Sequence, residues 1–418
     1  MPILGRDFKP GAEEKIYYLK KKIEEQFPGL WKPTEACLSV VSQLLISDIV
    51  NCLLLVLVGV PASRKTTVLK WFSDTPVTYC SDDFTPSAFV SHYASATEKD
   101  LSKIDLLPRI KGKVLIVAEL LPIFDAPYET LMHNMAIITR LLDGQGYTSD
   151  SGVHGRRGYT GAEGEYVFHW LGAIAFVPHH MWKLVGNMGP RIYFYLFPKE
   201  AEKDAKELAK ELQENYKEKT TICKNAVHSY ISYLLNSYPT KIEWEKEKDS
   251  SSACEMISNF ALLLCRLRGN VEIHHLDDSD EESLNYKQPI VEAPHRANQV
   301  LYNYARGHAV LYGRRHITNE DVPLVAKIAL NSANTDRVRL FEILISNNGK
   351  ATTKELKEQL NCSANMAIQT MMALKVLGLI EIKQATSGKQ GGRPMKIASI
   401  KPEFNWILRR EFKEIFKA

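Results

Sequence analysis

The sequence lacks any apolar run long enough to cross a membrane. Its longest such run, around residues 53–58, is far shorter than the roughly 18 residues that a spanning helix needs. The first residues contain no apolar segment ahead of a small-residue cleavage site, and the 7 cysteines include no C-x-x-C pair. These absences predict a cytoplasmic protein with no membrane contact, with reduced thiols, and with neither a disulfide framework nor a zinc knuckle.

The chain also lacks a strong net charge. Its 53 Lys and Arg against 49 Asp and Glu leave +4, so the total charge indicates no partner. The charge is unevenly distributed, because residues 336–418 carry 15 Lys and Arg against 8 Asp and Glu. We therefore expect this basic C-terminal segment to be the part that contacts a polyanion such as DNA.

The pattern of apolar runs divides the chain into four parts. Between residues 53 and 197, strand-like apolar runs alternate with helical stretches, which is typical of a parallel α/β sheet. A charged stretch at 199–220 has helical spacing and reads as a solvated helix edge. The predicted parts are an N-terminal helical brace, an α/β core, a helical module and a C-terminal basic domain, at 1–50, 51–198, 199–334 and 335–418.

The strongest motif is LLLVLVGVPASRKTTVLKWF at residues 53–72. An apolar strand leads to Gly59, and Lys65 and Thr66 open a helix at the spacing of a phosphate-binding loop, with Arg64 in place of the second glycine. Backbone N–H groups and the helix N-terminus would surround phosphates, Lys65 would reach their outer oxygens, and Thr66 would ligate Mg²⁺. The predicted ATP-binding residues are Gly59, Pro61, Ala62, Ser63, Arg64, Lys65, Thr66 and Thr67. The alternative is an ordinary strand–turn–helix with a lysine at its start.

This loop resembles the G-x-P-x-x-x-K-[ST] form found in the minichromosome maintenance (MCM) helicases, which are AAA+ ATPases. The resemblance covers about residues 35–335. It implies an α/β P-loop NTPase (AAA+) core with an α-helical lid, ATP and Mg²⁺ as cofactors, and a homo-oligomer such as a hexameric ring.

A second match, GKVLIVAEL at residues 112–120, resembles the strand that ends in the paired acids of a Walker B motif. The usual Asp-Glu pair is replaced by Ala118 and Glu119. The resemblance gives Glu119 the role of polarising the attacking water, while the acid that holds the magnesium shell is missing. Either Glu119 serves both roles, or the site hydrolyses ATP slowly, or another acid substitutes, the candidates being Asp82, Asp83 and Asp125.

The Gly-rich basic stretch 144–166 resembles the β-hairpin that such helicases insert before the sensor-1 strand. His154, Arg156 and Arg157 would then lie near its tip, and the two arginines would contact the DNA backbone. The alternative is a solvated surface hairpin. The sensor-1 strand WLGAIAFVPHH lacks its usual polar residue unless His179 replaces it.

Two further arginines have roles implied by the resemblance. Arg191, in NMGPRIYFYLF, would be an arginine finger that reaches the γ-phosphate bound by a neighbouring subunit. Residues 293–330 resemble the lid helices, and Arg296 would be the sensor-2 arginine. Within this segment, Thr318 and Asp321 also form a good helix start without any catalytic role.

Residues 337–398 have the order of a winged helix-turn-helix: three helices, then two strands around a Gly-rich basic tip. Lys389 and Arg393 in this wing suit the DNA backbone or minor groove, and Ser363, Asn365 and Gln369 suit phosphate and base-edge contacts. Winged helices also serve as protein docking modules. Beyond them, aromatics alternate with charges at helical spacing over 404–416, and we expect this stretch to pack back on the C-terminal domain.

Together these patterns predict an MCM-like AAA+ ATPase that acts on DNA as a helicase or remodelling factor. The alternative is a DNA-binding initiator or regulator that binds ATP as a switch and hardly hydrolyses it, as the missing Walker B acid suggests. A small-molecule phosphotransferase would also use a phosphate-binding loop, but it has no use for a finger, a lid and a winged helix together.

Overall fold

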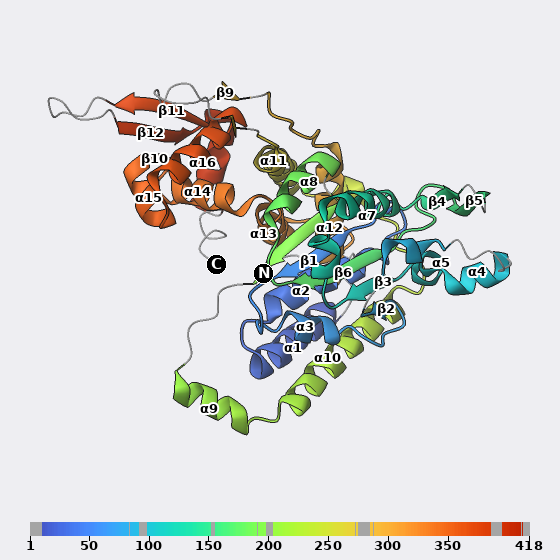
Figure 1. Ribbon diagram of the computed structural model, residues 1–418. Helices are drawn as coiled ribbons and strands as arrows, with labels where there is room; N and C mark the ends of the chain where they lie inside the picture. Colours follow the sequence, from blue (N-terminus) through green and yellow to red (C-terminus); the bar gives the residue numbers. More distant parts are fainter. Residues whose placement is uncertain are drawn as a thin grey trace. The chain divides into compact units, whose positions relative to one another are not determined.

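The computed structural model describes residues 11–82, 84–91, 98–151, 155–189, 191–197, 204–271, 273–274, 285–286, 288–385, 395–410 and 412 (Figure 1). The chain folds into two compact units, which we treat separately. Unit 1 comprises residues 1–178, 191–255 and 300–325, and unit 2 comprises residues 179–190, 256–299 and 326–418. In the described part of the chain, no helix is long and apolar enough to cross a membrane.

Unit 1 is built on a five-stranded parallel sheet with the order β2-β3-β6-β1-β7, so the predicted parallel α/β core is confirmed. The inner strands are buried, as expected for a parallel sheet covered on both faces. Because all the strands run the same way, their C-terminal ends meet at one edge. The strands are β1 (Leu54–Val58), β2 (Thr78–Ser81), β3 (Val114–Val117), β6 (His169–Ile174) and β7 (Ile192–Leu196).

Helices cover the sheet of unit 1. The helix α2 packs on β1 and β6, α3 packs on β6, and α1 runs along α10 (Figure 1). The predicted hairpin is present as β4 (Gly146–Ser151) paired with β5 (Gly155–Thr160). The helices that lie wholly in this unit are α1 (Ala12–Gln26), α2 (Trp31–Gln43), α3 (Lys65–Lys70), α4 (Glu98–Ile104), α5 (Leu106–Ile110), α6 (Leu121–Phe124), α7 (Tyr128–Leu141), α9 (Ala205–Gln213) and α10 (Tyr216–Ser237).

Three helices contain a boundary between the units: α11 (Ser251–Arg268), α12 (His295–Leu311) and α13 (Val322–Asn331). The turn before α13 is a capping box in which Thr318 accepts from the N–H of Glu320 and Asp321 accepts from the N–H of Thr318. The hydroxyl and carboxylate therefore satisfy backbone groups at this helix start, as the sequence predicts.

The C-terminal part of unit 2 combines the helices α14, α15 and α16 with an antiparallel sheet of order β10-β12-β11. Thr352 caps the second of these helices through a capping box with Glu355. The apolar side chains of Leu340, Leu356 and Leu374, one from each helix, are fully buried. The chain order is α14 (Thr335–Ser346), β10 (Lys350–Thr352), α15 (Thr353–Leu360), α16 (Ala364–Val376), β11 (Ile380–Ala385) and β12 (Met395–Ile400), and the unit also holds α8 (His179–Met188), β8 (Ile273–His274) and β9 (Asn285–Tyr286).

A buried group of charges ties α2 to α12 and to the turn before α13. His308 Nδ1 lies 2.6 Å from Asp321 Oδ1, and His308 Nε2 lies 3.6 Å from Glu35 Oε1. Arg314 makes a second contact to Asp321 at 2.7 Å. All of these side chains are buried, so each charge depends on its partners for stabilisation.

The pKa values of this group predict how stability depends on pH. Burial alone would lower the pKa of His308, but its contacts with Asp321 and Glu35 outweigh burial and raise it above the usual 6.5. Burial alone would raise the pKa of Glu35, but the same histidine and Lys32 lower it to about 2. The contribution of His308 to the free energy of unfolding is therefore complete below pH 6.5 and is lost as the pH rises through its raised pKa. The contribution of Glu35 to the same free energy is complete above pH 4.5 and is lost as the pH falls toward 2.

We expect His308→Gln to lower the free energy of unfolding by about 3 kcal/mol at pH 6, because it removes the positive charge between two buried carboxylates. The measurement is urea unfolding of wild type and variant at pH 6 and at pH 9. The wild type should lose stability over this range, and the variant should lose less. An equal loss in both proteins would contradict the assignment to His308.

Candidate functional site

The predicted phosphate-binding loop connects the C-terminal end of β1 to α3. Gly59 needs to be glycine, because a Cβ there would lie 2.8 Å from Ser63 Oγ and 3.0 Å from the Cβ of Phe197. The chain turns back on itself at this point, with the N–H of Ser63 donating to the carbonyl of Val60 at 3.2 Å. The loop is thus a compact turn at the edge where the C-terminal ends of the strands meet.

Arg64 adopts the backbone conformation that glycine normally provides at this position. Its φ is +66°, and Ala62 has φ +65°, so both lie in the left-handed region. The Arg64 side chain is directed toward α9, where it donates to Glu211 Oε1 at 3.0 Å and lies 5.5 Å from the ring centre of Phe27. The arginine therefore preserves the shape of the loop at a cost in backbone strain of about 1–2 kcal/mol.

We expect Arg64→Gly to be more stable than Arg64→Ala by about 1 kcal/mol, because both variants lose the contact with Glu211 while only glycine relieves the left-handed strain. Thermal or urea unfolding of the two proteins measures this difference. Alanine is the matched control, since it removes the same side-chain atoms beyond Cβ. Equal stability would show that the position carries no strain.

Lys65 is held inside the loop. Its Nζ donates to the carbonyls of Gly59 at 2.5 Å and Val60 at 2.9 Å and to Ser63 Oγ at 3.2 Å, and only 7% of the residue is exposed. Burial lowers the pKa of Lys65, and the negative charge of Glu119 opposes this shift. The ammonium group is thus surrounded by loop oxygens and lies within the field of the acid that follows β3, two strands away from β1 in the sheet.

The two threonines after Lys65 differ in their surroundings. Thr66 is exposed at the first turn of α3, where its hydroxyl is open to a ligand. Thr67 is buried, and its Oγ1 lies 2.7 Å from the hydroxyl of Tyr216 on α10. Sequence reasoning did not assign Tyr216 to this site, because its position in a charged helical stretch gave no signal for a contact with the loop.

Glu119 lies two residues beyond the end of β3, at the same sheet edge as the loop. It is exposed, and its Oε1 accepts from the N–H of Leu121 at 3.0 Å. Ala118 contributes no acid. Close packing behind this turn is possible because Gly172 of β6 leaves room for Leu120, whose Cδ1 would be 2.3 Å from an added Cβ.

The candidate substitutes for the missing acid are not gathered into a metal cluster. Asp82 and Asp125 are exposed, and Asp83 lies outside the described residues. In the described segments no group of three or more His, Cys, Asp or Glu is placed to hold a metal ion. Mg²⁺ in phosphate-transfer sites is held mainly by phosphate oxygens, waters and one or two side chains. The exposed Thr66 hydroxyl and the Glu119 carboxylate fit that limited requirement.

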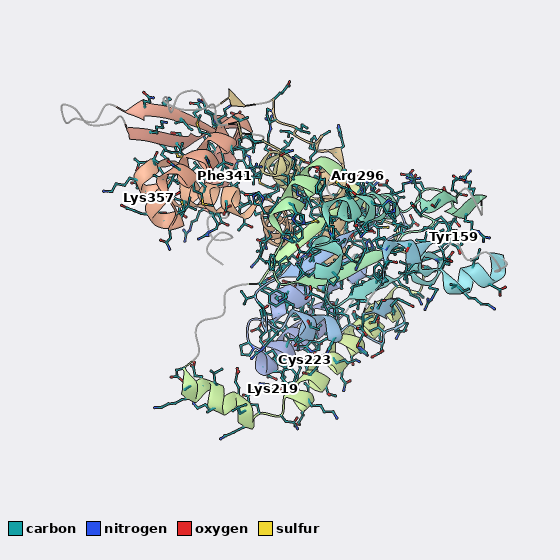
Figure 2. The ribbon with its side chains drawn as sticks, viewed as in Figure 1. Tyr159, Lys219, Cys223, Arg296, Phe341 and Lys357 are labelled. Carbon is teal, nitrogen blue, oxygen red and sulfur yellow. The ribbon has the colours of Figure 1, made fainter. Side chains whose placement is uncertain are left out.

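The polar residue expected near the end of the sensor-1 strand is absent from the described part of unit 1. The strand β6 ends at Ile174 and is followed by Ala-Phe-Val-Pro at 175–178. His179 is the first residue of α8 and belongs to unit 2, where it is exposed. Arg296 also belongs to unit 2, in the first turn of α12, and is half-buried (Figure 2).

Arg191 lies at the opposite edge of the sheet from the phosphate-binding loop. Its carbonyl accepts from the N–H of Leu54, at the N-terminal end of β1, so the length of the strand, roughly 16 Å, separates it from the loop. Its Nε lies 3.0 Å and its Nη2 lies 2.9 Å from Asp143 Oδ1. Asp143 was missed by sequence reasoning, because nothing in its surroundings in the chain indicates a partner 48 residues away.

The other predicted DNA contacts are only partly described. Arg156 and Arg157 lie in β5, opposite Asp150 and Ser149 of β4. Arg156 is exposed and Arg157 is half-buried. His154, Lys389 and Arg393 lie outside the described residues.

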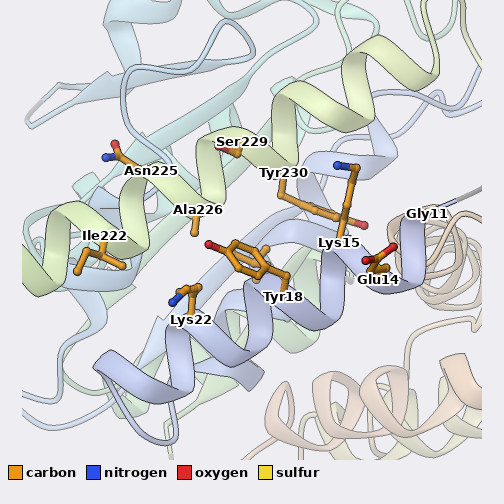
Figure 3. Close-up of a pocket in the computed structure, with 11 residues that line it drawn as sticks. Gly11, Glu14, Lys15, Tyr18, Lys22, Ile222, Asn225, Ala226, Ser229 and Tyr230 are labelled. Atoms are coloured by element: carbon orange, nitrogen blue, oxygen red, sulfur yellow. The ribbon is translucent and has the colours of Figure 1, made fainter.

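A separate cavity of about 610 Å³ lies between α1 and α10 (Figure 3). Its walls include Lys15, Tyr18, Lys22, Asn225 and Ser229. Two of the lysines lie over rings, Lys22 over Tyr18 at 5.6 Å and Lys15 over Tyr233 at 5.1 Å. The contact of Lys15 with Tyr233 joins α1 to α10, whereas that of Lys22 with Tyr18 lies within α1.

Comparison with known proteins identifies one segment of the chain. The family model for the AAA lid domain matches residues 293–332. These residues are similar to an AAA lid domain. The match covers α12, the turn after it and α13, and the predicted resemblance to AAA+ ATPases is thereby confirmed.

The fold is also similar to the crystal structure of a full-length MCM homolog from Methanopyrus kandleri, with a TM-score of 0.41 and 13% identity. That similarity covers 80% of this chain and 63% of the homolog. No curated protein matches the sequence.

Proposed function

We propose that the chain is an MCM-like AAA+ ATPase that binds ATP with Mg²⁺ and acts on DNA, coupling ATP hydrolysis to helicase or remodelling activity. The observation that carries this proposal is the environment of Lys65. Its ammonium group lies in a ring of loop oxygens at the C-terminal end of a parallel strand, and the charge of Glu119 acts on it from another strand end. The AAA lid supports the same class of protein.

Each residue of the site has a defined task in this proposal. Lys65 exchanges the loop carbonyls for the outer phosphate oxygens, and the Thr66 hydroxyl contributes one ligand to Mg²⁺. Bound Mg²⁺ neutralises the charge that develops on the phosphates. Glu119 orients and polarises the attacking water. Arg296 acts as the sensor-2 arginine of the lid.

Arg191 acts across a subunit interface in this proposal. Since it lies at the far edge of its own sheet, its guanidinium cannot serve the loop of the same chain. A head-to-tail ring, for which we propose a hexamer, brings each Arg191 to the loop of the next subunit. Asp143 holds the side chain in position until the neighbour's γ-phosphate competes for it.

The C-terminal part of the chain is proposed to bind DNA. The element order α14-β10-α15-α16-β11-β12 is that of a winged helix-turn-helix, and the strand pairing brings the two ends of the wing together. Ser363 is less available than its position suggests, because its hydroxyl accepts from the N–H of Met366 at 3.2 Å. Asn365 and Gln369 on α16 are the remaining base-edge candidates. In this proposal 1–50, 51–198, 199–334 and 335–418 act as brace, core, lid and DNA-binding domain of a cytoplasmic enzyme.

A second candidate function is a DNA-binding initiator or regulator that binds ATP as a switch. The replacement of the magnesium-shell acid by Ala118 favours it, because binding needs the loop while rapid hydrolysis also needs the acid.

The test is Mg²⁺-dependent ATP hydrolysis with and without single- and double-stranded DNA, comparing wild type with Glu119→Gln. An ATPase that acts on DNA should show turnover stimulated by DNA and lost in Glu119→Gln. ATP binding that changes DNA affinity without turnover would establish the switch. Failure to bind ATP at all would refute both.

We expect Lys389→Ala with Arg393→Ala to weaken DNA binding and to reduce the slope of log affinity against log salt by about 2, because each basic residue replaced removes about one phosphate contact. Fluorescence anisotropy with labelled duplex DNA at several salt concentrations gives the slope. Replacing Lys354 and Lys357 of α15 provides a control with the same loss of charge. A slope equal to that of wild type would rule out these two residues as phosphate contacts.

A further inference from the structure

A polar cavity of about 710 Å³ lies beside the β4–β5 hairpin in unit 1. Among the described residues, those that line it do not include the phosphate-binding loop, so it is a separate site. Tyr159, labelled in Figure 2, marks its position on β5. The polar, charged and aromatic residues that line the cavity include Ser91, Asp105, Arg156, Arg157, Tyr159 and Tyr166.

Two polar atoms that belong to residues lining the cavity are buried and have no hydrogen-bond partner within the described structure. They are the hydroxyl oxygen of Ser91 and the Nε of Arg157. Buried polar groups in native proteins are nearly always satisfied by the protein, by water or by a ligand. Two such groups on one cavity, both able to donate, indicate that an acceptor binds there.

Asp105 positions the two walls of the cavity. It is almost fully buried, its Oδ1 accepts from the N–H of Ser91 at 2.9 Å, and its Oδ2 accepts from the hydroxyl of Tyr159 at 2.8 Å. Both carboxylate oxygens are thereby engaged with the wall. Arg156 and Arg157 also line the cavity, so its lining residues include two positive charges and one negative charge. The net charge and the free donors match a phosphoryl group.

The remaining wall is aromatic. The rings of Tyr159 and Tyr166 have centroids 5.9 Å apart, and both residues are half-buried on the cavity. Aromatic side chains provide faces on which nucleobases stack irrespective of sequence. A volume of about 710 Å³ lies in the range of small-molecule sites and accommodates a nucleotide.

We propose that this cavity binds one nucleotide unit, with Arg157 Nε and Ser91 Oγ donating to its phosphoryl group and the tyrosine rings lying beside its base. The inference goes beyond the proposed backbone contact of the hairpin and does not depend on ATP hydrolysis. The nucleotide has two possible sources, a free mononucleotide or a residue of single-stranded DNA. Both carry the same chemistry.

The experiment uses the full chain with Lys65→Ala, so that the phosphate-binding loop does not contribute. Binding of AMP is measured by calorimetry, and binding of a fluorescein-labelled oligothymidylate by anisotropy. Arg157→Gln, Arg157→Lys and Ser91→Ala are introduced into this background. The control is Arg109→Gln, which removes a nearby arginine that contacts Tyr79 and does not line the cavity.

We expect Arg157→Gln to weaken binding by about tenfold or more, because it removes a charge-assisted hydrogen bond. Arg157→Lys should also weaken it, since lysine keeps the charge but lacks the Nε donor. Ser91→Ala should weaken binding severalfold without lowering the melting temperature of the ligand-free protein. Weakened binding of AMP in these variants identifies a free mononucleotide as the ligand. Weakened binding of the oligonucleotide alone identifies a residue of single-stranded DNA as the ligand.

The proposal is overturned if neither probe distinguishes Arg157→Gln from Arg109→Gln, because a general electrostatic effect would then account for binding. It is equally overturned if Arg157→Lys binds both probes as wild type does. Because every protein compared carries Lys65→Ala, a failure of the ATPase proposal leaves this result unaffected.

Discussion

Replacing Lys65 with alanine should reduce ATP affinity by about 100-fold and abolish hydrolysis, because its ammonium group is the only side-chain cation that the described loop encloses. Arg64, the adjacent cation, is directed toward α9 and cannot replace it. The measurements are calorimetric titration with ATP and Mg²⁺ and steady-state phosphate release. Wild-type turnover is the reference.

Lys70→Ala is the matched control, since Lys70 is an exposed residue in the last turn of the same helix. It should bind and hydrolyse ATP as the wild type does. A melting curve for each variant separates lost binding from lost folding. If Lys65→Ala binds and hydrolyses ATP as well as Lys70→Ala, the loop is not a nucleotide site and the proposed function fails with it.

The second large effect is expected at Arg191. Arg191→Ala should bind ATP nearly as well as wild type and lose turnover by about 1,000-fold, because an arginine that stabilises transition-state charge acts after binding. Its location at the opposite sheet edge places this action on the loop of a neighbouring subunit. Turnover and ATP affinity, measured on the same preparation, test the separation of the two effects.

Mixing two inactive variants tests the action across subunits. Arg191→Ala provides an intact Lys65, and Lys65→Ala provides an intact Arg191, so a random equal mixture should regain about a quarter of wild-type turnover at its interfaces. Arg140→Ala serves as the control, because Arg140 also contacts Asp143, at 3.5 Å, but is half exposed and has no proposed role. No recovery on mixing would show that Arg191 does not act in trans.

Local features of this protein could be predicted from its sequence because neighbouring residues produce them. The apolar run before Gly59 predicts β1 and the loop, and the hydroxyl and acid spaced three apart predict the cap at Thr318. The charged stretch 199–220 has the spacing of a single helix, but the structure divides it. It contains the whole of α9 and the start of α10, because Asn215 accepts from the N–H of Glu218 and begins a new helix.

The end of the chain shows a similar limit. Aromatic and charged residues at 404–416 suggested a regular helix, whereas residues Pro402–Leu408 form a 3₁₀ helix. Trp406 meets the ring of Phe260 on α11 with centroids 5.0 Å apart, and Phe412 contacts the same ring. Trp406 and Phe412 are thus spaced to contact one ring, that of Phe260 in unit 2. The periodicity of the residues at 404–416 does not predict this contact.

The sequence by itself determined the chemistry at the loop, since glycine, lysine and threonine at that spacing have one efficient use, and it determined the basic character of the C-terminal domain. Only the tertiary structure decided which residues surround that chemistry. The parallel sheet places Glu119 and Lys65 at the edge formed by the C-terminal ends of its strands, and it places Arg191 at the edge formed by their N-terminal ends. Tyr216 reaches Thr67 across 149 residues, and Asp143 reaches Arg191 across 48. Such pairs form because packing of distant segments buries them together, and the free energy of that burial depends on the whole fold rather than on any local run of residues.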